Sequence, residues 1–305
     1  MLKHFVTAIA LALYSFAAQA DNIKLIVPYA PGGSGDITAR IIAKHLNERI
    51  PAHNFVPEIH SGAGGAIAAQ MLARSTGKET VLMLHSLNVV VNSTKSGAGY
   101  TMLDFQPIVH LGAVPMFLMV KKDGPLDTLP KFLKSQVFYG SSGVGSGNSI
   151  AMAMIQQHTK QNMTHVPYKG EAPALIDVAG GNLGAVFSIL SGAKPYLDDG
   201  RLVVLGVTGK LRHPAMPDVP TLKEQGINAV SGPINWFMVF ANNSADPVLV
   251  KQVQNALDNA TKTEANTYAK LGTITQGRYT KDLQQFIQSE AIKVYQLLPT
   301  LEPRK

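Results

Sequence analysis

The sequence predicts an α/β protein built from two domains. Short apolar runs alternate along the chain with segments whose apolar residues recur at helical spacing, a pattern typical of a parallel sheet with helices on both faces. Three of the apolar runs are followed by a glycine-rich turn before the next helical segment begins. The chain is 305 residues long, and a length of that order favours two domains over one.

Each predicted strand is a short apolar run bounded by turn-forming or polar residues. The predicted strands are Ile23–Tyr29, Phe55–Ile59, Thr80–His85, Phe117–Val120, Val137–Tyr139, Thr164–Tyr168, Leu183–Phe187, Leu202–Val207 and Trp236–Phe240. The first predicted helix runs from Ile37 up to Pro51, because its apolar residues follow a helical period. The other predicted helices are Ala66–Ala73, a segment that ends near Thr159, Ala172–Ala179, Pro247–Thr261, Glu264–Leu271 and a C-terminal helix with Leu283, Ile287, Ala291, Val294 and Leu298 on one face.

The second domain is predicted to be inserted into the first. Phe117–Val120 leads into the polar connector Lys121–Pro125, where we expect the chain to pass from the first domain into the second (the first crossing). Trp236–Phe240 is expected to return to the first domain. The proline-rich stretch Arg212–Thr221 is expected to be a surface loop. The expected boundaries are residues 1–20 for a signal peptide, 21–120 plus 235–305 for domain 1, and 121–234 for domain 2.

The N-terminal segment predicts export. Lys3 and His4 precede the apolar stretch Phe5–Ala18, and Ala18-Gln19-Ala20 fits a signal-peptide cleavage site. We therefore expect a cleaved signal peptide and a periplasmic protein. The chain contains no cysteine, so no lipid anchor is expected at the cleavage site.

The glycine-rich turns are the main functional signal. They are Pro31–Asp36, Ser61–Gly65 and Ser141–Ser149, each between a predicted strand and a predicted helix. Such a turn gathers unpaired backbone N–H groups at the positive end of a helix, which favours a bound anion. The alternative is that the glycines only permit tight turns with positive φ. Asp36 is expected to cap its own helix in the first turn.

The sequence shows no catalytic or metal-binding constellation. No two histidines stand at H-x-H or H-x-x-x-H spacing, and the G-x-S-x-G elbow of serine hydrolases is absent. Gly143–Gly147 matches part of a dinucleotide-binding turn, but Glu171 lies past the position where that fold needs an acidic residue. We therefore expect no metal, no cofactor and no enzyme activity. The alternative to a binding protein is a secreted α/β enzyme, such as a nucleotide-dependent oxidoreductase.

The charge pattern does not predict nucleic-acid binding. The formal net charge is +7, but the basic residues are scattered and are not interleaved with aromatic residues. A mild positive charge favours attraction of anionic solutes. The protein is expected to be a monomer.

The glycine-rich turns and their neighbours closely resemble the substrate-binding proteins of tripartite tricarboxylate transporters, the Bug-type periplasmic receptors. The matching segments are Ile26–Arg40, Ser61–Gly65, Ser142–Ser146, Thr164–Ala174, Pro217–Gly226 and Trp236-Phe237. The resemblance implies a periplasmic-binding-protein (Venus flytrap) fold that closes on a carboxylated solute and delivers it to membrane permease subunits. A ligand-loaded receptor that signals to a membrane sensor is the alternative within the same fold.

The resemblance also implies which residues hold the ligand. One carboxylate is expected at Pro31–Asp36 and Ser61–Gly65, and the other end of the ligand at Ser142–Asn148 and Tyr168–Glu171, where the Tyr168 hydroxyl is expected to donate. The chain departs from the family at His60, Ser149 and Gly184, which leaves dicarboxylates, tricarboxylates, aromatic carboxylates and amino acids open as ligands. The expected ligand-binding residues are Tyr29, Pro31, Gly32, Gly33, Ser34, Asp36, Ser61, Ala63, Gly64, Gly65, Ser86, Ser142, Gly143, Gly145, Ser146, Asn148, Tyr168, Lys169 and Gly170.

Overall fold

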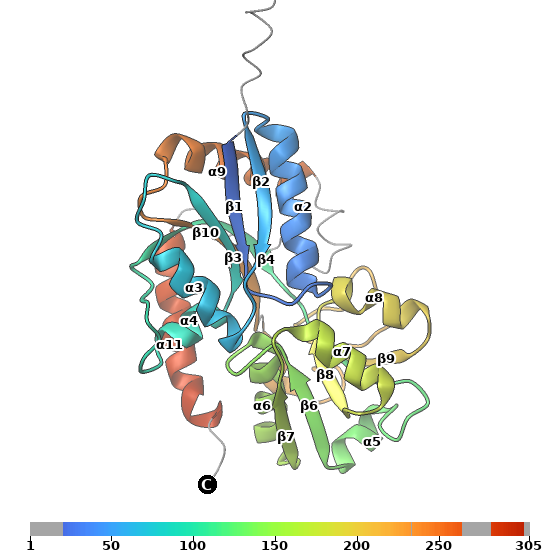
Figure 1. The fold of residues 1–305 in the computed structure, drawn as a ribbon. Helices are drawn as coiled ribbons and strands as arrows, with labels where there is room; N and C mark the ends of the chain where they lie inside the picture. The colour runs from blue at the N-terminus through green and yellow to red at the C-terminus, as the bar shows by residue number, and fades with distance from the viewer. Residues whose placement is uncertain (1–20, 233, 264–281, 302–305) are drawn as a thin grey trace, which may run out of the picture.

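The computed structural model describes residues 21–232, 234–263 and 282–301. Two five-stranded sheets, each flanked by helices, form two lobes (Figure 1). The prediction of a two-domain α/β fold is therefore confirmed. The predicted signal peptide and the predicted helix Glu264–Leu271 lie outside the described residues.

The first lobe contains both ends of the described chain. Its sheet has the strand order β2-β1-β3-β10-β4, in which β1 is parallel to β2 and β3, and β10 is antiparallel to β3 and β4. Three consecutive residues of the first strand, Leu25–Val27, are buried because helices cover both faces of the sheet. The strands are β1 (Asp21–Val27), β2 (His53–Ile59), β3 (Val81–Ser86), β4 (Phe105–Ala113) and β10 (Trp236–Asn242); the helices are α2 (Ser34–Arg49), α3 (Ala66–Ala73), α4 (Asn88–Ser93), α9 (Pro247–Thr263) and α11 (Leu283–Leu301).

The second lobe repeats this arrangement with strands from the middle of the chain. Its sheet has the order β7-β6-β8-β5-β9, in which β6 is parallel to β7 and β8, and β5 is antiparallel to β8 and β9. The carboxyl ends of β1 and β6 therefore occupy equivalent places in the two sheets. The strands are β5 (Phe117–Lys121), β6 (Val137–Ser141), β7 (Met163–Pro167), β8 (Ala185–Ser188) and β9 (Leu202–Val207); the helices are α5 (Leu129–Lys134), α6 (Gly147–Thr159), α7 (Glu171–Gly180) and α8 (Leu190–Asp198).

The two crossings between the lobes lie side by side and are hydrogen-bonded to each other. Val114 N–H donates to the Asn235 carbonyl at 2.9 Å. Met116 N–H donates to Thr208 Oγ1 at 3.0 Å, and Thr208 N–H donates back to the Met116 carbonyl at 2.9 Å. The first crossing thus precedes β5, whereas the sequence placed it at Lys121. The apolar pattern of Phe117–Val120 does not indicate to which of the two sheets this strand belongs. Its pairing with β8 and β9 places it in the second sheet.

Several elements were not predicted, and each has a local reason. β4 contains Pro107 and Gly112, which weaken a strand pattern but are tolerated because β4 is the edge strand beside β10. α4 contains the β-branched run Val89–Val91, which has low helix propensity. α8 contains Pro195, and the short helix α5 was also missed.

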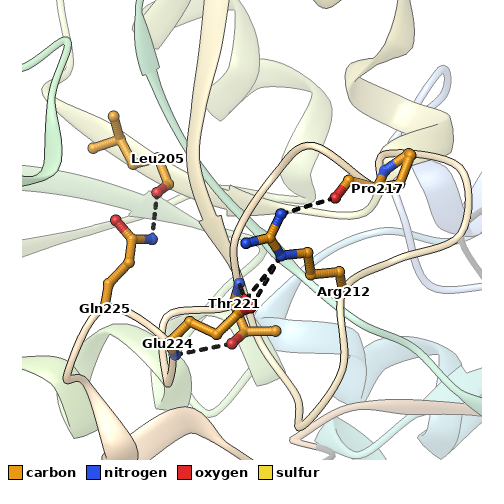
Figure 2. Close-up of polar contacts among 6 residues, drawn as sticks. All are labelled: Leu205, Arg212, Pro217, Thr221, Glu224 and Gln225. Atoms are coloured by element: carbon orange, nitrogen blue, oxygen red, sulfur yellow. Dashed lines mark hydrogen bonds and ion pairs between the residues drawn. The ribbon is translucent and has the colours of Figure 1, made fainter.

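The predicted surface loop Arg212–Thr221 is held by polar contacts around one carboxylate (Figure 2). Glu224 pairs with Arg212 at 3.0 Å, accepts from Thr221 N–H at 2.6 Å, and donates its own N–H to Thr221 Oγ1 at 3.0 Å. This reciprocal arrangement has the bond pattern of a capping box, here in a turn. Gln225 Nε2 also donates to the carbonyl of Leu205 in β9 at 2.9 Å, which ties the loop to the second sheet. Part of the family-like segment Pro217–Gly226 therefore has a structural role.

Candidate functional site

A small cavity lies between the two lobes. The space open to the centre of a water molecule is about 20 Å³, which is room for about one water. A ligand with several non-hydrogen atoms therefore requires the lobes to move apart. The lining residues are Tyr29, Gly33, Ser34, Gly35, Ser86, Asn88, Asn235 and Phe237 from the first lobe, Ser142, Gly147, Asn148, Glu171 and Ile189 from the second, and Met116 from the first crossing.

The first glycine-rich turn, Pro31–Asp36, brings the N-terminus of α2 to this cavity. Gly32 N–H donates to Asp36 Oδ2 at 2.9 Å, and Asp36 Oδ1 pairs with Arg40 at 2.8 Å. Asp36 is 4% exposed and is not among the cavity-lining residues. This carboxylate therefore serves the first turn of its own helix, as its position in the sequence indicated.

A second carboxylate reaches the same helix from the opposite lobe. Glu171 is the first residue of α7, and its Oε1 accepts a hydrogen bond from Ser34 N–H at 3.0 Å. Glu171 is 8% exposed. Burial raises the pKa of this carboxyl group, and hydrogen bonds from Ser34, Ile189 and Ser188 oppose the rise. The sequence placed Glu171 in a recognition segment but gave no sign that it would span the cleft.

The third turn, Ser141–Ser149, is closed by its own polar side chains. Asn148 Oδ1 accepts from Ser142 N–H at 3.2 Å and from Ser149 N–H at 3.1 Å, and Asn148 Nδ2 donates to the Phe187 carbonyl at 3.2 Å. Gly143 N–H and Gly145 N–H donate to Ser141 Oγ and Ser149 Oγ, each at 3.1 Å. The expected open backbone N–H groups are therefore not found at Ser142, Gly143, Gly145 and Ser149. The same bonds leave no amide of Gly143 or Gly145 free for a pyrophosphate.

The second turn, Ser61–Gly65, is held by hydrogen bonds from side chains of β3 and α4. The Gly64 carbonyl accepts from Asn88 Nδ2 at 3.1 Å and from Asn92 Nδ2 at 2.8 Å. The Gly65 carbonyl lies 3.2 Å from His85 Nε2, and His85 Nδ1 accepts from Ser86 N–H at 2.9 Å. Nδ1 is therefore the unprotonated nitrogen, and Nε2 carries the proton donated to Gly65. Burial lowers the pKa of His85 to about 4, against the opposing hydrogen bonds to Gly65 and Ser86.

Glycines also allow the two lobes to touch. A Cβ at Gly143 would lie 2.8 Å from Gly64 Cα in the other lobe, and a Cβ at Gly170 would lie 2.8 Å from Ala30 N. Both glycines have positive φ, +121° and +140°, which other residues rarely adopt. The glycine-rich turns thus contribute close backbone contact across the seam, a role that sequence reasoning did not consider.

The structure divides the expected ligand-binding residues into three groups. Tyr29, Gly33, Ser34, Ser86, Ser142 and Asn148 line the cavity described above. Ala63, Gly64, Gly143, Tyr168 and Lys169 line a separate, more open groove at the seam, together with Lys95. Pro31, Gly32, Asp36, Ser61, Gly65, Gly145, Ser146 and Gly170 line neither of the two.

Two aromatic residues of the family-like segments, Tyr168 and Trp236, make their polar contacts away from the cavity. The Tyr168 hydroxyl donates to Asp177 Oδ2 at 2.5 Å, within its own lobe, so it is not directed at the cavity. Trp236 is 3% exposed, donates to Glu290 Oε2 at 3.0 Å and packs on Phe286 of α11. Its side chain therefore packs inside the first lobe and does not cover the cavity.

The cavity presents polar groups but no cation. Its lining contains no lysine, arginine or histidine among the described residues, and Glu171 is its one acidic member. Asn235 Oδ1 is buried and has no hydrogen-bond partner in the described part of the chain, and the buried Tyr29 hydroxyl has Ser86 as its polar neighbour. Buried polar atoms of this kind favour a ligand that completes their hydrogen bonds. Asn235 and Gly35, which the sequence analysis did not select, belong to this site because the second crossing and the Tyr29 ring pack there.

No group of three or more histidine, cysteine, aspartate or glutamate side chains in residues 21–232, 234–263 and 282–301 is arranged to hold a metal ion. Within the same ranges, no helix combines the length and the apolar character needed to span a membrane.

Known proteins resemble this chain over most of its length. A family model for the tripartite tricarboxylate transporter family receptor matches residues 38–302. Protein BugT of Bordetella pertussis is 28% identical over 257 residues, which cover 81% of this chain and 78% of BugT.

Solved structures resemble it as well. The structure of R. palustris Rpa4515 with adipate has a TM-score of 0.85 and 26% identity, and the match covers 92% of this chain and 97% of that one. MatC from Rhodopseudomonas palustris with bound malate has a TM-score of 0.80 and 23% identity, with 92% and 99% coverage, and shows the same fold.

Proposed function

Because the chain belongs to the tripartite tricarboxylate transporter receptor family, we propose that it captures a small carboxylate-bearing metabolite in the periplasm and delivers it to the membrane permease subunits of such a transporter. The observation that carries this proposal is the cavity between the lobes, which residues of both lobes line with polar groups. A relative of the same fold, Rpa4515, has been solved with adipate. The proposed activity is binding and release without chemistry.

The proposed mechanism is closure of the lobes on the ligand. The paired crossings at Met116 and Thr208 form a narrow connection about which the lobes can rotate. A ligand that contacts Tyr29 and Ser86 in one lobe and Ser142 in the other binds the closed form more tightly than the open form. The ligand therefore shifts the equilibrium between the open and closed forms towards the closed form, to an extent set by that difference in affinity. The permease would recognise the closed form.

Calorimetry tests the binding step. The purified protein is titrated with dicarboxylates of four to six carbons, their amino- and hydroxy-substituted forms, and citrate. We expect at least one of these acids to bind with a dissociation constant near 1 μM, about −8 kcal/mol. Failure of every acid to bind would overturn the proposal.

The role of closure is tested with Gly170→Val. The new side chain would meet the backbone of Ala30 and would require an unfavourable positive φ, so closure should be blocked and affinity should fall about 100-fold, or roughly 2.7 kcal/mol. Gly77→Ala is the control, because no atom lies within 4 Å of a Cβ at Gly77. Equal affinity of the two variants would contradict the mechanism. Uptake of the bound acid by cells that lack the receptor, complemented with each variant, tests delivery.

A further inference from the structure

Glu171 stands where a ligand carboxylate would be expected. The N-terminus of a helix attracts anions, and Ser34 N–H is one of the unpaired amides at the start of α2. In this structure that amide is taken by Glu171 Oε1 at 3.0 Å. The protein thus supplies its own carboxylate at the positive end of the helix.

The position of Glu171 is fixed by its surroundings. It begins α7 directly after Gly170, and a Cβ at Gly192 of α8 would lie only 2.4 Å from Glu171 Oε1. Ser188 and Ile189 lie near the same carboxyl group and oppose the rise of its pKa. The side chain is buried and lines the cavity.

The charges near Glu171 do not favour a second carboxylate beside it. The lining contains no basic residue in the part of the chain that the structure describes. Arg40 of α2 is paired with Asp36, and Lys169 lines the separate groove. A ligand carboxylate next to Glu171 would therefore meet a like charge in a buried site, which is unfavourable.

The cavity instead offers acceptors at this end. Glu171 is an acceptor when ionised, and Asn235 Oδ1 is a second acceptor with no partner. The Tyr29 hydroxyl, which lies beside Ser86, is a donor that can serve a carboxylate. A carboxylic acid that turns an amino or hydroxyl group towards Glu171 and its carboxylates towards Tyr29 would satisfy both ends.

We propose that Glu171 determines specificity by accepting a hydrogen bond from an amino or hydroxyl group of the ligand, so that the receptor selects amino- or hydroxy-substituted acids over unsubstituted dicarboxylates. This inference rests on the proposed function. It narrows the ligand classes that the sequence left open. Aromatic carboxylates and plain dicarboxylates lack the donor that Glu171 requires.

Matched pairs of acids test the proposal by calorimetry at neutral pH. The pairs are aspartate with succinate, glutamate with glutarate, 2-aminoadipate with adipate, and malate with succinate, each differing by one donor group. We expect the substituted acid of the bound pair to bind roughly 10- to 100-fold more tightly, the range of one charge-assisted hydrogen bond. In Glu171→Gln, which keeps the shape but loses the charge, this ratio should fall to near 1.

Glu48→Gln is the control, because it removes an exposed carboxylate at the far end of α2. Thermal unfolding of each variant without ligand confirms that it is folded. If the acids bind and the ratio is the same in the wild type and in Glu171→Gln, the specificity role is overturned. Tighter binding of succinate, glutarate or adipate by the wild type also overturns it. If no acid binds to any of the proteins, the proposed function fails instead.

Discussion

The first and third glycine-rich turns occupy equivalent places in the two sheets but satisfy their backbone groups in different ways. At Pro31–Asp36 the amides of Gly32 and Ser34 bond to carboxylates, one of which comes from the other lobe. At Ser141–Ser149 the amides bond to neutral serine and asparagine side chains within the turn. Similar glycine patterns therefore give a charged contact across the cleft in one lobe and a self-contained turn in the other. The partners of the amides, more than the glycines, decide the role.

The largest expected effect concerns the third turn. Asn148→Ala removes the acceptor for two backbone amides and the donor to Phe187 in a buried position. We expect a loss of about 3 kcal/mol in the free energy of unfolding, because buried donors lose their partners. Urea denaturation measures the loss. Ser149→Ala removes the hydroxyl that accepts from Gly145 N–H and should cost less. If Asn148→Ala loses less stability than Ser149→Ala, a structural role for Asn148 is contradicted.

The second turn extends the comparison, because a histidine supports it. His85 has a lowered pKa of about 4 in the folded protein, against about 6.5 when unfolded. Its contribution to stability is therefore complete above pH 6.5 and is lost as the pH falls towards 4.

We expect the wild type to lose about 2 kcal/mol from this group between pH 7 and pH 5, measured by urea denaturation at each pH. His85→Gln keeps a donor for Gly65 and should lack this part of the pH dependence. An unchanged pH profile in His85→Gln would show that another group is responsible.

The smallest effect is expected in the loop shown in Figure 2, which lies outside all three turns. Thr221→Ala removes the acceptor for Glu224 N–H and should cost about 1 kcal/mol of stability, the usual net value of one hydrogen bond. Thermal unfolding measures this cost. Ligand affinity should stay the same, and a clear change in affinity would mean that the loop takes part in binding.

Much of the fold could be predicted from local patterns, because buried parallel strands are continuous apolar runs and helices have a periodic apolar face. β4 escaped prediction because its pairing with β10 tolerates Pro107 and Gly112 at an edge. The site was harder to predict. Tyr29, Ser34 and Asn148 were expected from the family resemblance, but the bond between Ser34 and Glu171 joins residues 137 positions apart. Such a contact depends on how the lobes meet, which no local pattern contains.

The position of β10 has a consequence for the order in which the protein can fold. β4 pairs with β10 at one edge of the first sheet, and β10 begins only at Trp236. Until that strand has been synthesised, Phe105–Ala113 lacks the neighbour against which it is built. All strands of the second sheet, in contrast, lie between Phe117 and Val207. The lobe in the middle of the chain can therefore form before the lobe at its beginning is complete.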